Sequence, residues 1–219
     1  MYKAVIFDLD GTLLNTLDDL ADSTNFALEK NGFPTRTIDE VRRFVGNGNI
    51  KLIHRALPDT ASEAQFQKTY SDFTEHYKTN MANKTKPYDG INDLLKNLYE
   101  NGVKLAIVTN KIDFAAQELC GGLFGDYVKT VIGSDGVRPN KPAPDGLYLA
   151  LENSASRKRT LCLSETARLT LQLPKMPKWI VSESFGASEM RSSCVKSALK
   201  GQQRMPPNCK VCYYFNKNY

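Results

Sequence analysis

Four apolar residues near the start of the chain are followed at once by two aspartates and a glycine. Residues 4–7, Ala-Val-Ile-Phe, have the continuous hydrophobicity of a strand that is buried on both faces of a sheet. Gly11 indicates a turn after this strand, so Asp8 and Asp10 fall where open α/β sheets bind ligands. Side chains alternate along an extended chain, so both carboxylates face one pocket while Leu9 points the other way. The pattern predicts an α/β fold with a parallel sheet and a site at its edge.

Two carboxylates in one pocket suit phosphoryl transfer. One can attack phosphorus once the charge of the phosphate is neutralised, and the other can protonate the leaving oxygen and then activate water. A hard cation would supply that neutralisation. A lone Asp-x-Asp-Gly can also be a solvated turn or part of a calcium loop. The calcium alternative fails, because Leu13 and Leu14 stand where further oxygen ligands are needed.

A second buried strand is indicated over residues 105–111, where an apolar run ends in Thr109, Asn110 and Lys111. Thr109 and Asn110 can donate side-chain and backbone hydrogen bonds to phosphate oxygens where the next helix begins. The same pair of residues is also typical of a helix cap. The sequence therefore predicts a second phosphate-facing edge, with Thr109 and Asn110 as its candidate binding residues.

A third motif is the proline-stiffened loop of residues 138–145, Arg-Pro-Asn-Lys-Pro-Ala-Pro-Asp. It holds Lys141 among rigid residues and so limits what its ammonium can reach. A single surface lysine is usually solvated, and this motif gains its meaning from the other two. Together the three motifs predict a phosphate site that includes the Lys141 cation.

In order and spacing, these motifs resemble the haloacid dehalogenase-like hydrolases, in particular the phosphoglycolate phosphatase-like branch with a small helical cap. The resemblance covers residues 1–152 and implies a Rossmann-like parallel sheet core. It implies that Asp8 is the nucleophile, Asp10 the acid and base, Thr109 a phosphate-binding group and Lys141 the lysine that steadies a phosphoaspartate. The metal of that family is Mg²⁺, which the resemblance assigns to Asp8 and Asp10.

The reaction implied by the resemblance is hydrolysis of a small phosphate monoester through an aspartyl-phosphate. The expected partner is a small phosphorylated metabolite, with 2-phosphoglycolate first and other sugar phosphates or pyrophosphate as alternatives. A mutase of the same architecture stays open, as does a catalytically inactive relative that binds phosphate or a partner protein. The sequence does not set the oligomeric state.

A helical stretch separates the first two strands. Residues 16–85 show helical periodicity with almost no strand signal, as expected for a cap, which leaves residues 1–15 and 86–152 for the core. The loop of Gly46, Asn47 and Gly48 interrupts this stretch and can close over a small anionic substrate; in the resembling branch such a loop helps to select the substrate. An ordinary turn between two helices is the alternative.

Composition changes abruptly after residue 152. Residues 153–219 contain 12 Lys and Arg but three Glu and no Asp, so the net charge of +5 arises from this tail. Such a tail can bind nucleic acid or a membrane surface, and Cys209 and Cys212 can form half of a zinc site or a redox pair. No second cysteine pair, nearby histidine or known RNA-binding motif accompanies them. We therefore expect no nucleic-acid or membrane partner; a disordered appendage is the plain alternative.

The start of the chain shows no signal peptide or membrane span, since Met1 leads directly into the first strand. A cytoplasmic protein with reduced thiols is therefore expected.

The anomalous tail also lacks the fourth motif of the resembling family, a strand ending in Gly-Asp with a second Asp four residues after the first. Glu165, which follows the strand-like Leu161-Cys162-Leu163, falls within one residue of the missing carboxylate and is the candidate substitute metal ligand. Because Glu is longer and the loop lacks its glycine, the chain as it stands is expected to be an impaired enzyme.

A frameshift near Glu152 would account for this tail. When the segment from Asn153 to about Arg191 is back-translated with permitted codons and shifted by one nucleotide, it gains a strand, a carboxylate turn, a helix and a second strand. The turn then contains Gly-Asp-Ser-Glu-Thr-Asp, which is the missing motif.

Sequencing the gene across the codons for residues 151–160 tests the frameshift. We expect one additional base, which restores the fourth motif and replaces the basic tail. An unchanged reading frame would contradict the inference and make the tail a genuine part of the protein.

Overall fold

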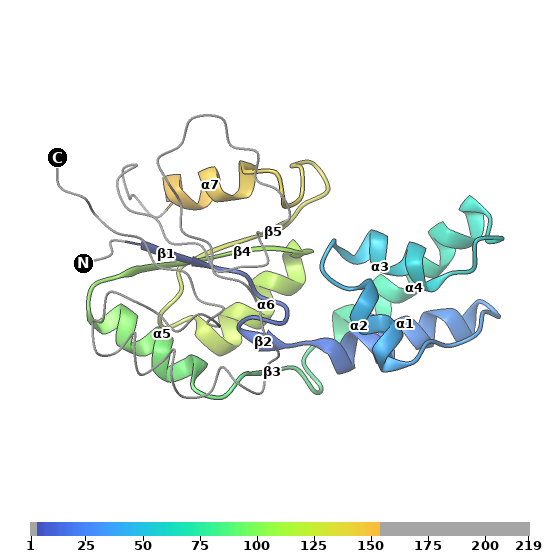
Figure 1. Cartoon of the computed structure of the whole chain (residues 1–219), viewed down its shortest axis with the longest axis horizontal. Coiled ribbons are helices and arrows are strands. Elements are labelled where there is room, and N and C mark those ends of the chain that lie inside the picture. The colour runs from blue at the N-terminus through green and yellow to red at the C-terminus, as the bar shows by residue number, and fades with distance from the viewer. Residues whose placement is uncertain (1–3, 154–219) are drawn as a thin grey trace.

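A parallel sheet with helices on both faces forms the core of the protein (Figure 1). The computed structural model describes residues 4–153. The strand order is β1-β4-β5, and both pairings are parallel. The predicted α/β fold and the predicted strand over residues 4–7 are confirmed, and the second predicted strand is one residue longer at each end. The strands are β1 (Ala4–Phe7), β4 (Lys104–Ile112) and β5 (Thr130–Ser134).

Alternation along the strands divides the apolar core between the two faces of the sheet. Val5 and Phe7 of β1 belong to the larger hydrophobic cluster, which includes residues of α5 and α6. Ile6 belongs to the smaller cluster, in which Leu147 and Ala150 of α7 cover the opposite face. Every residue of β1 is buried, as the continuous apolar run predicted. The helices of the core are α5 (Ile91–Glu100), α6 (Asp113–Phe124) and α7 (Asp145–Asn153).

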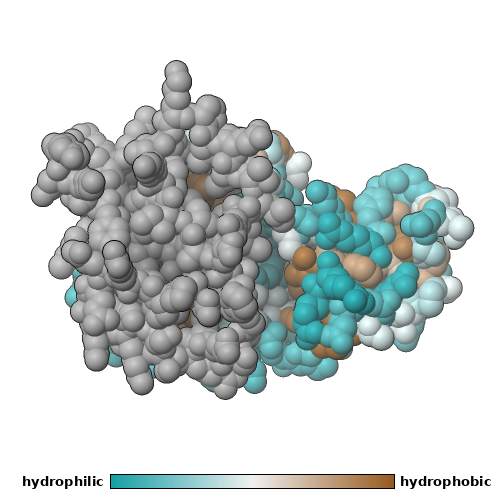
Figure 2. Space-filling view, viewed as in Figure 1, coloured by the Kyte–Doolittle hydropathy of each residue, from teal (hydrophilic) through white to brown (hydrophobic). Residues whose placement is uncertain are grey.

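Four helices between the short strands β2 (Leu14–Asn15) and β3 (Lys86–Pro87) form a separate bundle beside the core, seen at the right of Figure 1. Capping boxes begin α2 and α4, where the side chains of Thr37 and Ser62 accept hydrogen bonds from backbone amides. Figure 2 shows hydrophilic residues interspersed with apolar ones on the visible face of this cap. Its helices are α1 (Leu17–Lys30), α2 (Ile38–Phe44), α3 (Asn49–Ala56) and α4 (Glu63–Asn80).

A buried carboxylate joins the two chain segments that connect cap and core. Asp19, in the first turn of α1, is 1% exposed. Its oxygens accept hydrogen bonds from the backbone amides of Lys84, at 3.0 Å, and Thr85, at 2.8 Å, just before β3. β2 and β3 themselves pair antiparallel, Leu14 with Pro87 and Asn15 with Lys86. The outgoing and returning segments are therefore fixed to each other at the base of the cap.

The tail and its candidate residues, Glu165, Cys209 and Cys212, lie outside the described residues. Expectations about them stay predictions. Among the helices of the described part, none combines the length and the apolar character needed to cross a membrane.

Replacing Asp19 tests the joint between the two segments. Asp19→Ala leaves two backbone amides without their acceptor, so we expect the free energy of unfolding to fall by about 2 kcal/mol more than in Asp18→Ala. Both variants remove an acidic residue from the first turn of α1, so the helix-dipole contribution cancels between them. Urea unfolding measures the difference, and equal losses in the two variants would contradict this role of Asp19.

Candidate active site

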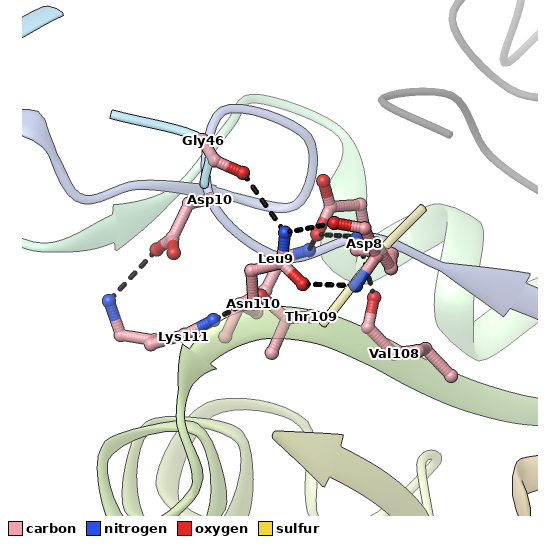
Figure 3. A network of polar contacts seen from close by, with 9 residues as sticks. Asp8, Leu9, Asp10, Gly46, Val108, Thr109, Asn110 and Lys111 are labelled. Carbon is pink, nitrogen blue, oxygen red and sulfur yellow. Dashed lines mark hydrogen bonds and ion pairs between the residues drawn. The ribbon is translucent and has the colours of Figure 1, made fainter. Parts of the chain in front are cut away.

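The loop after β1 presents both predicted aspartates at the carboxyl end of the sheet. The carbonyl oxygen of Leu9 accepts hydrogen bonds from the amides of Thr12, Leu13 and Leu14, at 3.2, 3.0 and 3.1 Å. This folds the chain back tightly while Asp8 and Asp10 stay directed toward the end of β4 (Figure 3). The parallel pairing of β1 with β4 brings Thr109, Asn110 and Lys111 to the same edge.

Core and cap together line one open pocket, with an empty volume of about 440 Å³. Seven of the predicted site residues lie on it, whereas the side chain of Asn47 accepts a hydrogen bond from Arg55 and Glu165 lies outside the described residues. The core supplies Asp8, Asp10, Thr109, Asn110, Lys111 and Lys141, and the cap supplies Leu20, Val45, Gly46, Gly48, Asn49 and Leu52.

Each aspartate of the pocket is paired with its own lysine. Lys141 Nζ lies 2.7 Å from Asp8 Oδ1, and Lys111 Nζ lies 2.9 Å from Asp10 Oδ1. Lys141 also donates to the Val108 carbonyl at 2.9 Å, and Asp8 Oδ1 accepts the amide of Leu9 at 2.8 Å. The four charged side chains sum to zero, so a bound phosphate dianion calls for additional positive charge.

Oxygen donors suited to a hard cation are present, because Mg²⁺ is usually held by one or two carboxylates together with phosphate oxygens and water. Asp8 and Asp10 fit that requirement in kind. Within residues 4–153, no group of three or more His, Cys, Asp or Glu side chains is arranged to hold a metal ion. The described part therefore offers the carboxylates of Asp8 and Asp10, without a third acidic, cysteine or histidine side chain beside them.

Lys111 is buried with its charge satisfied by two partners. Its Nζ donates to Asp10 and also to the phenol oxygen of Tyr77, at 2.6 Å, on cap helix α4. Burial by itself lowers the pKa of the ammonium, but Asp10 and Tyr77 outweigh it, and the pKa of Lys111 lies above its ordinary value. Burial raises the pKa of the Tyr77 phenol, so this group stays neutral at neutral pH.

Sequence reasoning noted the Lys111 ammonium at a strand end without assigning it to the site, and it missed Tyr77. A lysine within a buried strand, three residues after its apolar run, was the available signal, since a charge there needs a partner.

Asn110 holds two loops together. Its side-chain amide donates to the carbonyl of Gly46, at 3.2 Å, and to that of Lys141, at 3.1 Å, while its oxygen accepts the Lys141 amide at 2.7 Å. The cap loop and the lysine loop are thus both attached to the end of β4. Direct binding of phosphate by Asn110 stays a prediction, and its side chain is already engaged with backbone groups.

The cap loop approaches the core closely at Gly48. A Cβ atom at this position would lie 3.2 Å from Asn140 Nδ2 and 3.3 Å from the Asn110 carbonyl oxygen, and the φ of Gly48 is +87°. Gly46 also has positive φ, +115°, yet no atom lies within 4 Å of its hypothetical Cβ. Only Gly48 therefore combines backbone strain with a tight contact to the core.

A parallel α/β core with paired carboxylates, a hydroxyl and a lysine at its strand ends, under a helical cap, defines a class of phosphate-handling hydrolases. The chain belongs to the haloacid dehalogenase-like hydrolase family, whose model matches residues 5–163. The family resemblance expected from the three motifs is confirmed.

Similar proteins point to one branch of this family. The chain is 35% identical over 156 residues to phosphoglycolate phosphatase 1 of Pseudomonas aeruginosa, a match that covers 68% of this chain and 57% of that protein. It is 33% identical over 158 residues to the phosphoglycolate phosphatase of Thiobacillus denitrificans, covering 68% of each. A crystal structure of a predicted phosphoglycolate phosphatase from Haemophilus somnus matches with a TM-score of 0.66 and 29% identity, covering 70% of this chain and 72% of that one.

Alanine substitutions at Gly46 and Gly48 distinguish the cost of a positive φ from the cost of a close contact with the core. Both substitutions carry the cost of positive φ, of order 1–3 kcal/mol, but only Gly48→Ala also pushes the cap loop away from the core. Hydrogen exchange of the Lys141 amide, which Asn110 holds, should accelerate by about fivefold in Gly48→Ala relative to Gly46→Ala. Equal exchange rates in the two variants would show that the contact does not hold the loops together.

Proposed function

We propose that the protein is a Mg²⁺-dependent phosphatase that hydrolyses a small phosphate monoester through an aspartyl-phosphate, with 2-phosphoglycolate as its first candidate substrate. The observation that carries the proposal is the placement of Asp8 and Asp10 in one pocket, each oriented by a separate lysine. Family membership and the names of the similar proteins support the choice of reaction and substrate.

Asp8 is the nucleophile in this proposal. Its carboxylate attacks phosphorus while the bond from phosphorus to the leaving alcohol oxygen breaks, and Asp10, which has taken up a proton from solvent before this step, gives that proton to the leaving oxygen. Asp10 then takes a proton from water, the water oxygen attacks phosphorus, and the aspartyl-phosphate bond breaks to release inorganic phosphate and restore Asp8. Lys141 and the Leu9 amide both bind Asp8 Oδ1 and thereby fix the orientation of the attacking carboxylate.

Asp8 and Asp10 would hold the Mg²⁺ ion, which when bound supplies the positive charge that neutralises the phosphate oxygens. For the chain with the sequence as it stands, we propose Glu165, which lies outside the described residues, as a third ligand in place of the absent fourth motif. Because a longer side chain replaces the expected aspartate, the proposed activity is impaired.

The cap side of the pocket supports a small substrate. Leu20, Val45 and Leu52 contribute apolar side chains, and Gly46 and Gly48 contribute backbone. The attachment of Gly46 to Asn110 keeps the cap loop close to the reacting carboxylates.

A second candidate is a phosphate-binding protein without turnover. It is favoured by the described site itself, in which each carboxylate has a lysine partner and two carboxylates alone face a metal. In this case Lys141 and Thr109 would bind phosphate, and Asp8 would not attack its phosphorus.

Release of phosphate from 2-phosphoglycolate, with and without Mg²⁺, decides between the two. We expect Mg²⁺-dependent turnover that Asp8→Asn abolishes and that Asp10→Asn lowers by about 10²-fold to 10⁴-fold, the usual contribution of an acid and base. Asp126→Asn, at an exposed position away from the pocket, is the matched control and should keep full activity. A folded wild-type chain without Mg²⁺-dependent release would overturn the enzymatic proposal.

A further inference from the structure

A buried chain of polar groups connects the pocket with the cap. It runs from Asp10, in the loop after β1, to Lys111 at the end of β4 and on to Tyr77 of α4, through contacts of 2.9 and 2.6 Å. Lys111 is 2% exposed and Tyr77 is fully buried. Of the three side chains, that of Asp10 alone keeps appreciable exposure, 17%, toward the pocket. The acid and base carboxylate is thus bound from behind by a network that ends in another domain of the fold.

The network has little freedom to rearrange. Transferring a lysine ammonium from water into the interior costs several kcal/mol unless it is paired, so Lys111 needs both partners in place. In a low-dielectric interior such hydrogen bonds are strong, and each constrains the next. The phenol at the far end is fixed as well, because the Tyr77 ring stacks on Phe73 of the same helix at 5.4 Å between centroids.

The other ion pair of the pocket is formed within the core. Lys141 and Asp8 both belong to the core, and their side chains are 14% and 10% exposed. Lys141 takes its second contact from the Val108 carbonyl, which is again a core group. The two lysines therefore differ: Lys141 takes its second contact from a carbonyl of the core, whereas Lys111, which binds Asp10, is itself bound by a side chain of the cap.

We propose that Lys111 is a positioning residue that holds Asp10 toward the pocket, and that Tyr77 makes this position depend on how the cap is seated. For its catalytic consequence the inference rests on the proposed function. When α4 is seated against β4, the phenol oxygen completes the coordination of the ammonium and Asp10 is held in place. When α4 moves away, Lys111 loses a partner and Asp10 gains freedom, so proton transfer slows while the cap is open.

Kinetics of Tyr77→Phe test the catalytic part. This substitution removes one oxygen that does not line the pocket, so we expect kcat to fall by about tenfold, the worth of one hydrogen bond to a charged group, with KM unchanged. Tyr70→Phe is the matched control, since Tyr70 lies two turns earlier on α4, and it should keep the wild-type kcat. In a Lys111→Met background, Tyr77→Phe should have no further effect, because its route to Asp10 is gone.

Nuclear magnetic resonance of ¹⁵N-lysine-labelled protein tests the network without turnover. The protected Lys111 ammonium should give its own signal, assigned by its loss in Lys111→Arg, and Tyr77→Phe should shift it while Tyr70→Phe should not. This measurement also serves if Lys111→Met fails to fold.

The outcomes separate this inference from the proposed function. Turnover in the wild type with equal kcat for Tyr77→Phe and Tyr70→Phe overturns the inference and leaves the function standing. Absence of turnover in the folded wild type overturns the function, and the ammonium signal then decides the inference alone. If Tyr77→Phe does not shift the Lys111 ammonium signal, the inference is overturned in either case.

Discussion

Lys111 carries a full positive charge into a part of the protein that water does not reach, and the arrangement of the site follows from meeting that charge. Asp10 supplies the opposite charge and Tyr77 a further oxygen, so the loop after β1, the end of β4 and helix α4 must converge at one point. Removing the charges of Lys111 and Asp10 from water costs free energy, and this cost is offset only while the ion pair and the hydrogen bond to Tyr77 are both formed. The same requirement that stabilises the site therefore also determines where the cap sits.

Three polar contacts of different kinds fix the cap and its attachment to the core. At the base, Asp19 joins the two connecting segments through backbone amides. At the mouth of the pocket, Asn110 attaches the cap loop at Gly46 to the sheet. Between these lies the contact of Tyr77 with Lys111. In each of the three, a directional hydrogen bond within the protein replaces hydrogen bonds to water. Because these bonds depend on geometry, they fix the position of the cap.

Local patterns were sufficient to predict β1 and β4 and the residues that gather at their ends. The buried run before Asp8 and the run before Thr109 are each visible within a few residues, and parallel pairing then brings them together. Tyr77 and Asp19 could not be found in this way. In an amphipathic helix Tyr77 has the spacing of a core residue alongside Phe73, and the partner of Asp19 is a backbone segment 65 residues away along the chain. Only the folded arrangement shows that these side chains have polar partners.

The short ladder of β2 and β3 gives the cap an unusual relation to the rest of the chain. The two ends of the cap lie side by side in this ladder, about 4.8 Å apart as in any pair of neighbouring strands. The cap is therefore inserted into the core at one point, as a tight turn between two strands would be. A change of helix length or sequence within the insertion leaves the closure of that turn, and hence the chain entropy of the core, nearly untouched. The helices of the cap can therefore change at little entropic cost to the core, provided that the contact of Tyr77 with Lys111 is kept.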